Sequence, residues 1–125
     1  MSKVLVVEDD LNIRNLLEVR LRGMGHRVLV AASAAEALDV LTEKGAPDVA
    51  VLDVLMPGRS GLELLAELRE DPAYAEMPVI FLSGRVQESD IAAGRALGAT
   101  YLTKPVVLSA LAGAIDRSLA AASGW

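Results

Sequence analysis

Five short apolar runs alternate along the chain with five stretches of helical periodicity, and this alternation restricts the possible folds more than any other feature. The runs are rich in Val, Ile and Leu, and they cover Lys3–Val7, Arg27–Ala31, Asp48–Leu52, Pro78–Leu82 and Thr100–Thr103. Apolar residues that are continuous rather than alternating are typical of strands in a parallel sheet covered on both faces. Repeated strand–helix units connect by right-handed crossovers, so we predict an α/β fold with helices on both faces of one five-stranded parallel sheet.

The stretches between the runs place apolar side chains at the i, i+3, i+4 spacing of an amphipathic helix. The predicted buried stripes are Ile13, Leu16, Leu17, Leu21 and Met24; Ala34, Ala37, Leu38 and Leu41; Leu62, Leu64, Leu65 and Leu68; Ile91 to Leu97; and Leu108, Leu111, Ile115 and Leu119.

Boundary signals agree with these helices. A Ser followed three residues later by Glu has the spacing of a capping box, an Asp before a helix can cap it, and a Gly often ends one. The predicted capping boxes are Ser33 with Glu36 and Ser60 with Glu63, the predicted single N-cap is Asp10, and the predicted helix ends are Gly23, Gly45 and Gly98.

Length and composition limit the kind of protein. With 125 residues, of which 53% are hydrophobic, the chain fits one folded domain, which we assign to residues 1–122, with a C-terminal tail over residues 123–125. A net charge of −5 argues against direct binding of nucleic acid. The sequence has no Cys, no signal peptide and no run of about 20 apolar residues. We therefore expect no disulfide, no membrane span and a cytoplasmic location.

Polar residues follow four of the predicted strands at their carboxyl ends. These residues are Glu8-Asp9-Asp10 after the first strand, Asp53 after the third, Ser83-Gly84 after the fourth and Lys104-Pro105 after the fifth. Ligands of open α/β sheets bind beyond the carboxyl ends of the strands. We therefore expect these side chains, which are distant in sequence, to converge in space.

The combination of residue types favours phosphoryl transfer. The acids Glu8, Asp9 and Asp53 would repel one another unless a cation lay among them, and Mg²⁺ accepts carboxylate oxygens while it also binds water and phosphate oxygens. Lys104 adds a fixed positive charge and Ser83 a hydroxyl donor. A carboxylate such as that of Asp53 is deprotonated at neutral pH, so it can act as a nucleophile and form an acyl phosphate without a general base.

The chain resembles the receiver domain of bacterial two-component response regulators over most of its length. The motifs that carry the resemblance span residues 4–10, 47–58, 61–65, 78–84 and 101–105. The resemblance implies a flavodoxin-like fold with strand order 2-1-3-4-5. It also implies a sensor histidine kinase or phosphotransfer protein as the phosphoryl donor, and no enzymatic activity beyond the chain's own phosphorylation and dephosphorylation. The phosphorylated form is expected to act on a downstream protein partner, on a covalently linked output domain or through a homodimer.

The resemblance further implies a role for each residue of the cluster. Asp53 is the expected phosphoacceptor, and Lys104 is the lysine expected to bridge to the phosphoryl group. The expected ligands of Mg²⁺, or of Mn²⁺ in its place, are Asp53, Asp9 directly, Glu8 through water, and the main-chain carbonyl of Leu55.

Three further residues are implied to form a switch. Ser83 is expected to move to the phosphoryl group, Tyr101 to turn inward after it, and Pro105 to follow a cis peptide bond. The face built from the fourth helix, the fifth strand and the fifth helix is then expected to change for a partner. The segment before Tyr101 is one residue shorter than the family usually has, which leaves the position of its ring open. Leu55 and Arg85 occupy positions that tune the lifetime of the phosphoryl group in this family.

Two alternatives remain from the sequence. The chain could be a receiver that binds partners without phosphorylation, although the complete set of site residues argues against this. It could also be a hydrolase with an aspartyl nucleophile, but such enzymes carry the nucleophile after their first strand and need a cap for which the chain has no room. A dinucleotide-binding domain is excluded, because no Gly-rich turn follows the first strand. Whether the domain stands alone or was part of a larger regulator is open.

Overall fold

The computed structural model describes residues 2–84 and 88–122, in which strands and helices alternate strictly. The strands are β1 (Lys3–Val7), β2 (Arg27–Ala31), β3 (Val49–Asp53), β4 (Val79–Ser83) and β5 (Thr100–Thr103). The helices are α1 (Leu11–Gly23), α2 (Ala34–Lys44), α3 (Gly61–Arg69), α4 (Glu88–Ala96) and α5 (Leu108–Ala122). The predicted α/β fold is confirmed. The expected tail over residues 123–125 lies outside the described residues.

Two strands differ slightly from the prediction. β3 and β4 each begin and end one residue later than the apolar runs suggested. Asp53 pairs with Leu82, and Ser83 pairs with Thr103, so both polar residues belong to the ladders of the sheet. A prediction from apolar side chains alone ends both strands too early, because here the backbone pairing continues through a buried polar residue.

The strands form one parallel sheet in the order β2-β1-β3-β4-β5, which confirms the predicted strand order. The chain leaves β1 for β2 on one side and later returns to place β3 on the other side. The order therefore reverses between β1 and β3. In open α/β sheets, ligands bind at such a reversal, beyond the carboxyl ends of the strands.

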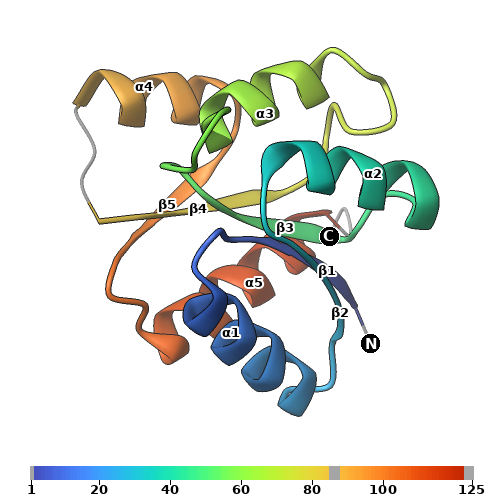
Figure 1. Cartoon of the computed structure of the whole chain (residues 1–125), viewed down its shortest axis with the longest axis vertical. Helices are drawn as coiled ribbons and strands as arrows, with labels where there is room; N and C mark the ends of the chain where they lie inside the picture. Colours follow the sequence, from blue (N-terminus) through green and yellow to red (C-terminus); the bar gives the residue numbers. More distant parts are fainter. Residues whose placement is uncertain (1, 85–87, 123–125) are drawn as a thin grey trace.

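The helices cover both faces of the sheet (Figure 1). α1 and α5 lie on one face, and α2, α3 and α4 lie on the other. The core is divided in the same way: Leu17, Leu21, Leu111 and Ile115 belong to the first cluster, and Leu41, Leu64, Leu65 and Phe81 belong to the second. Among the described residues, no helix is both long enough and apolar enough to cross a membrane.

The predicted helix starts are largely confirmed. Asp10 accepts hydrogen bonds from two backbone N–H groups in the first turn of α1, and Ser60 and Glu63 form both bonds of a capping box at α3. At α2, Ser33 accepts a hydrogen bond from the N–H of Glu36, which is one half of the predicted box. Each cap satisfies a backbone donor that the helix itself cannot satisfy.

The predicted helix ends are confirmed at all three glycines. Gly45 and Gly98 have φ of 82° and 83°, a left-handed conformation that glycine adopts without strain. Gly23 is the last residue of α1, but the left-handed glycine after this helix is Gly25, with φ of 93°. The turn after α1 therefore contains Met24 and the left-handed Gly25.

The apolar stripe predicted for α1 is wrong at two positions. Leu17 and Leu21 are fully buried and Ile13 packs against the same cluster, whereas Leu16 is 46% exposed and Met24 is 45% exposed. α1 packs against β1 and β2, the two strands at one edge of the sheet. A helix over the edge of the sheet has a narrower buried stripe than the i, i+3, i+4 pattern alone suggests.

Candidate functional site

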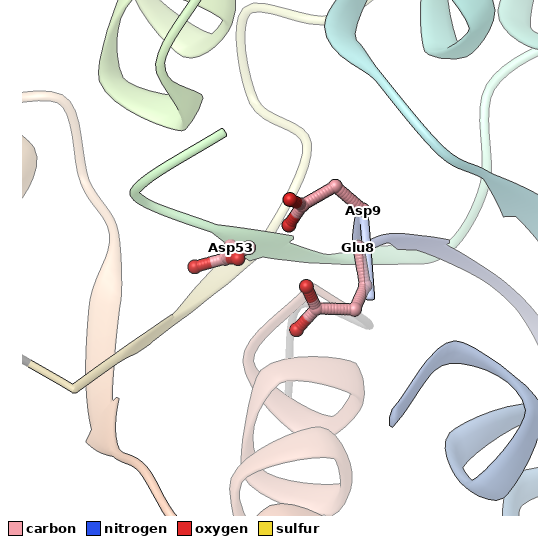
Figure 2. A group of neighbouring side chains, drawn as sticks. All are labelled: Glu8, Asp9 and Asp53. Carbon is pink, nitrogen blue, oxygen red and sulfur yellow. The ribbon is translucent and has the colours of Figure 1, made fainter. Parts of the chain in front are cut away.

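The carboxyl ends of β1, β3, β4 and β5 bring the predicted site residues together. The register places Val7 beside Leu52 and Asp53 beside Leu82, so Glu8, Asp53 and Ser83 follow one another across the edge of the sheet. Figure 2 shows the carboxylates of Glu8, Asp9 and Asp53 directed toward one another. The convergence expected from the sequence therefore occurs.

The three acids differ in their exposure. Glu8 is 1% exposed and Asp53 is 5% exposed, while Asp9 lies open to solvent. One carboxylate oxygen from each lies within 4.8 Å of the others. Three oxygen donors at this separation suit a hard divalent cation, whose ligands in proteins are carboxylates, carbonyls and water. The donor set therefore fits Mg²⁺ or Mn²⁺.

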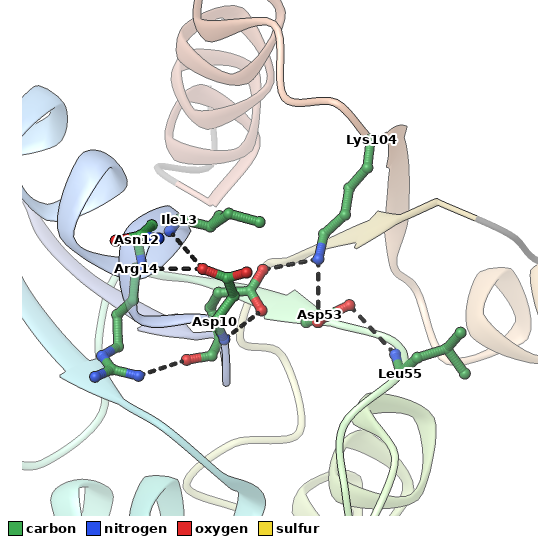
Figure 3. A network of polar contacts seen from close by, with 8 residues as sticks. Asp10, Asn12, Ile13, Arg14, Asp53, Leu55 and Lys104 are labelled. Atoms are coloured by element: carbon green, nitrogen blue, oxygen red, sulfur yellow. Dashed lines mark hydrogen bonds and ion pairs between the residues drawn. The ribbon is translucent and has the colours of Figure 1, made fainter.

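Lys104 reaches from the end of β5 into this acidic group (Figure 3). Its Nζ donates to Oε1 of Glu8 at 2.8 Å and lies 3.1 Å from Oδ2 of Asp53. Burial by itself would lower the pKa of Lys104, but the hydrogen bonds to Glu8 and Asp53 outweigh it and raise that pKa above its ordinary value. The ammonium therefore stays charged and links the two buried carboxylates.

Burial has the opposite consequence for Glu8. Because its carboxyl group is removed from water, the pKa of Glu8 rises from 4.5 to about 7. The hydrogen bond from Lys104 lowers this pKa and the neighbouring Asp53 raises it again. The ionised form of Glu8 is therefore poorly solvated, and a cation bound beside it would favour that form.

Backbone groups hold the two buried carboxylates in place. The N–H of Asp10 donates to Oε2 of Glu8 at 3.2 Å, and the N–H of Leu55 donates to Oδ1 of Asp53 at 3.3 Å (Figure 3). Arg14 donates from Nη1 to the carbonyl of Glu8 at 3.0 Å. These contacts fix the directions of both side chains before any ligand arrives.

Ser83 is the buried donor of the site. It is 3% exposed, and among the described residues its hydroxyl has no hydrogen-bond partner. Its carbonyl accepts a hydrogen bond from the N–H of Lys104 at 2.8 Å, which joins the ends of β4 and β5. A buried hydroxyl normally has a partner, so this one is free to bind a group that enters the site.

Three of the remaining predicted residues, Tyr101, Pro105 and Leu55, lie on β5 or shortly after the ends of β5 and β3. The peptide bond between Lys104 and Pro105 is cis, as expected. The ring of Tyr101 packs against Phe81 with 5.2 Å between the ring centroids, and its hydroxyl donates to the carbonyl of Asp90 at 2.7 Å. Leu55 is 62% exposed beside Asp53. Arg85, predicted to tune the phosphoryl lifetime, lies outside the described residues.

One residue of the site was missed from the sequence. At Gly61, the first residue of α3, an added Cβ would lie 3.0 Å from Cε1 of Phe81 and in direct conflict with the backbone oxygen of Asp53. The carbonyl of Val54 accepts a hydrogen bond from the Gly61 N–H at 2.9 Å. Two sequence features pointed to this glycine: it directly follows a capping Ser, and it begins the family motif over residues 61–65.

Comparisons with known proteins agree with this geometry. Residues 4–116 match the family described as the response regulator receiver domain. The chain belongs to this family. It is thus a receiver domain of two-component systems, and this family is not a classical enzyme family.

Several relatives of this receiver domain are known. The transcriptional regulatory protein AfsQ1 of Streptomyces coelicolor is 40% identical over 107 residues, which are 85% of this chain but 46% of that protein. This receiver domain thus spans about half the length of that relative. The crystal structure of the response regulator receiver domain protein from Clostridium thermocellum has a TM-score of 0.90 and 31% identity, and covers 98% of both chains. Chemotaxis protein CheY4 of Vibrio cholerae has a TM-score of 0.88 and 32% identity, over 95% of this chain and 99% of that one.

Proposed function

We propose that this receiver domain accepts a phosphoryl group on Asp53 from a sensor histidine kinase or a phosphotransfer protein, and that its altered surface then acts on a partner. The observation that carries the proposal is the environment of Asp53. Its buried carboxylate lies 3.1 Å from the ammonium of Lys104 and within 4.8 Å of the carboxylate oxygens of Glu8 and Asp9. A nucleophile with a fixed cation and further oxygen donors beside it matches the needs of phosphoryl transfer.

The transfer itself requires little covalent chemistry from the protein. An Oδ of Asp53 forms a bond to phosphorus while the bond between phosphorus and the donor's leaving atom breaks, and the leaving group keeps that electron pair. The product is an acyl phosphate. Lys104 stabilises negative charge on the phosphoryl oxygens, and the unpartnered hydroxyl of Ser83 supplies a hydrogen bond to one of them.

A divalent cation completes this site. Asp9 and Asp53 would bind Mg²⁺ or Mn²⁺ directly, Glu8 through water, and the main-chain carbonyl of Leu55 would be a further ligand. When bound, the ion neutralises charge on the carboxylates and on the phosphoryl oxygens. The two buried acids and Lys104 hold the donor atoms in place, so little rearrangement is needed on binding.

The proposed output is a change in the face formed by α4, β5 and α5. A phosphoryl group adds about −1.5 to −2 charges at neutral pH and draws Ser83 and Lys104 toward itself. Tyr101 packs against Phe81 of β4 and donates to the carbonyl of Asp90 in α4, so a shift of the β4 end would change its environment. The face would then bind a downstream protein, a covalently linked output domain or a second copy of the chain. The domain itself would not contact nucleic acid.

Three related statements remain predictions from the sequence. The receiver domain is assigned to residues 1–122, its location is expected to be cytoplasmic, and its chemistry is expected to be limited to its own phosphorylation and dephosphorylation.

The test is the mass of the intact protein after incubation with acetyl phosphate, with and without Mg²⁺, beside the variant Asp53→Asn. We expect a single Mg²⁺-dependent phosphoryl adduct that the variant does not form. Absence of an adduct, even when a beryllofluoride complex is used as a stable mimic, would favour a receiver that binds partners without phosphorylation. Release of phosphate from many donors with no adduct on Asp53 would favour a hydrolase instead.

A further inference from the structure

Gly94 is the buried residue of α4, and it lies in the interior of that helix. Its φ is not among the positive values found at four other glycines, so the backbone does not require glycine here. A glycine in a helix interior is about four- to fivefold less favourable than an alanine for helix formation. The residue is therefore unfavourable for the helix and must be explained by a contact.

The contact is with the ring of Tyr101. A Cβ added at Gly94 would lie 2.8 Å from both Cε2 and Cζ of this ring, and closer still to its hydroxyl oxygen. Real Cβ atoms essentially never approach another atom within 3.0 Å. The ring thus occupies the space that any other side chain at position 94 would fill.

The same ring has two more contacts that define its place. It packs against Phe81 of β4, with 33° between the ring planes. Its hydroxyl donates to the carbonyl of Asp90, one turn before Gly94 in α4. One side chain from β5 therefore joins the core at β4 to the first turns of α4.

We propose that Gly94 positions Tyr101: its missing Cβ forms a seat on α4 that holds the ring and so lets Tyr101 tie β5 to α4. A Cβ at position 94 would meet only the far end of the Tyr101 side chain, which can move away by rotation about χ1. This inference names the residue that positions Tyr101, and its bearing on signalling rests on the proposed function of the α4, β5 and α5 face.

The first test is a double-mutant cycle in urea unfolding, made on the unphosphorylated chain. With Tyr101→Ala, the seat is empty, and Gly94→Ala should raise the folding equilibrium constant about four- to fivefold through helix propensity. With Tyr101 present, the same substitution should give a smaller rise or a fall, because the ring loses its place and its hydrogen bond. An equal effect of Gly94→Ala in both backgrounds would overturn the proposal.

The second test reports on the ring itself and does not depend on the sign of a stability change. The sequence contains two tyrosines, Tyr74 and Tyr101, so a chain labelled with fluorotyrosine has two ¹⁹F resonances, which Tyr101→Phe assigns. In Gly94→Ala, the Tyr101 resonance should move and gain the isotope shift of a solvent-exposed ring, while the Tyr74 resonance stays in place. An unmoved Tyr101 resonance would contradict the seat.

The matched control is Gly113→Ala in the interior of α5. There an added Cβ would meet only the guanidinium of Arg117, at 3.1 Å from Nη1, and no aromatic ring. This variant should gain helix propensity and leave the Tyr101 resonance unchanged.

Both tests use the unphosphorylated chain, so they hold even when Asp53 takes no phosphoryl group. One further result depends on both proposals. A phosphodonor should shift the Tyr101 resonance in the native chain but not in Gly94→Ala.

Discussion

At the scale of single residues, the site depends on charges that are held apart from water. Glu8 and Asp53 are almost completely buried, and Lys104 is the cation that contacts both of them. A buried charge is tolerable only when it is paired or neutralised. The same arrangement makes the site responsive to pH and to the loss of any one member.

Replacing Lys104 with Met should separate its role in transfer from its role in charge balance. The variant should be phosphorylated on Asp53 about 100-fold more slowly, because an electrostatic contact to the transferred group is lost. Its affinity for Mg²⁺ should rise, since the ammonium no longer occupies oxygens of Glu8 and Asp53. Phosphorylation rates and calorimetric titration measure the two effects. Lys44→Met, at an exposed lysine of α2, is the control, and an equal rate in both variants would exclude a role for Lys104 in transfer.

The raised pKa of Glu8 predicts how the metal-free chain responds to pH. An unfolded chain ionises this carboxyl near its ordinary pKa of 4.5, whereas the folded chain retains the proton until the pH reaches about 7. Between these values the folded state binds more protons, so stability falls as the pH rises through this window. Urea midpoints in the presence of a chelator should show this fall. In Glu8→Gln the slope should be smaller, because the amide does not titrate; parallel curves for the two proteins would count against a raised pKa.

At the scale of secondary-structure elements, the position of α3 decides how Asp53 is presented. The helix begins at Gly61, whose N–H donates to the carbonyl of Val54 and whose missing Cβ allows the backbone of Asp53 to approach. Ser60 and Glu63 close the same turn with a capping box. The start of α3 is therefore fixed to the end of β3 by contacts that no bulkier residue permits.

Gly61→Ala should disturb both stability and the site. Because the added Cβ conflicts with backbone atoms that cannot rotate away, we expect a loss of about 1–3 kcal/mol in the free energy of unfolding. Phosphorylation of Asp53 by acetyl phosphate should also slow. The matched control is Gly23→Ala at the end of α1, where an added Cβ meets nothing within 4 Å. That variant should be at least as stable as the native chain, since alanine favours a helix more than glycine does, and equal losses at both glycines would refute the steric explanation.

At the scale of the whole molecule, Arg69 joins the segments that precede β4 and β5, at the end of the sheet opposite the site. Its guanidinium, at the end of α3, donates to the carbonyls of Leu97, Tyr74 and Met77 at 2.9, 2.8 and 2.7 Å. These carbonyls belong to the segments that lead into β4 and β5. Burial lowers the pKa of Arg69, and nearby Glu76 opposes this.

Arg69→Met should therefore destabilise the domain as a whole. Removal of three charge-assisted hydrogen bonds leaves carbonyls without partners, and we expect a loss of about 2 kcal/mol in the free energy of unfolding. Arg69→Lys should recover only part of this, since an ammonium lacks the planar fork of a guanidinium. Arg20→Met, at an exposed position of α1, is the control. Chemical denaturation of the four proteins measures the effect, and no loss in Arg69→Met would show that water replaces the arginine without penalty.

The features that the sequence predicts correctly are those carried by neighbouring residues. Continuous apolar runs indicate the buried strands, helical periodicity indicates the helices, and Asp10 and Ser60 indicate where two of them begin. The site residues Glu8, Asp9, Asp53, Ser83 and Lys104 were found because each lies at or just after the carboxyl end of a strand, and parallel strands bring such ends to one edge.

The tertiary structure alone decides what depends on contacts between distant segments. Glu8 and Asp9 are adjacent in sequence, yet only the first is buried, because its side chain turns toward Lys104. Gly94 looks like an unfavourable helix residue until the ring of Tyr101 is seen against it. Local patterns determine which elements form, since propensity and periodicity act over a few residues, whereas burial and steric fit are fixed only when elements far apart in the chain pack together.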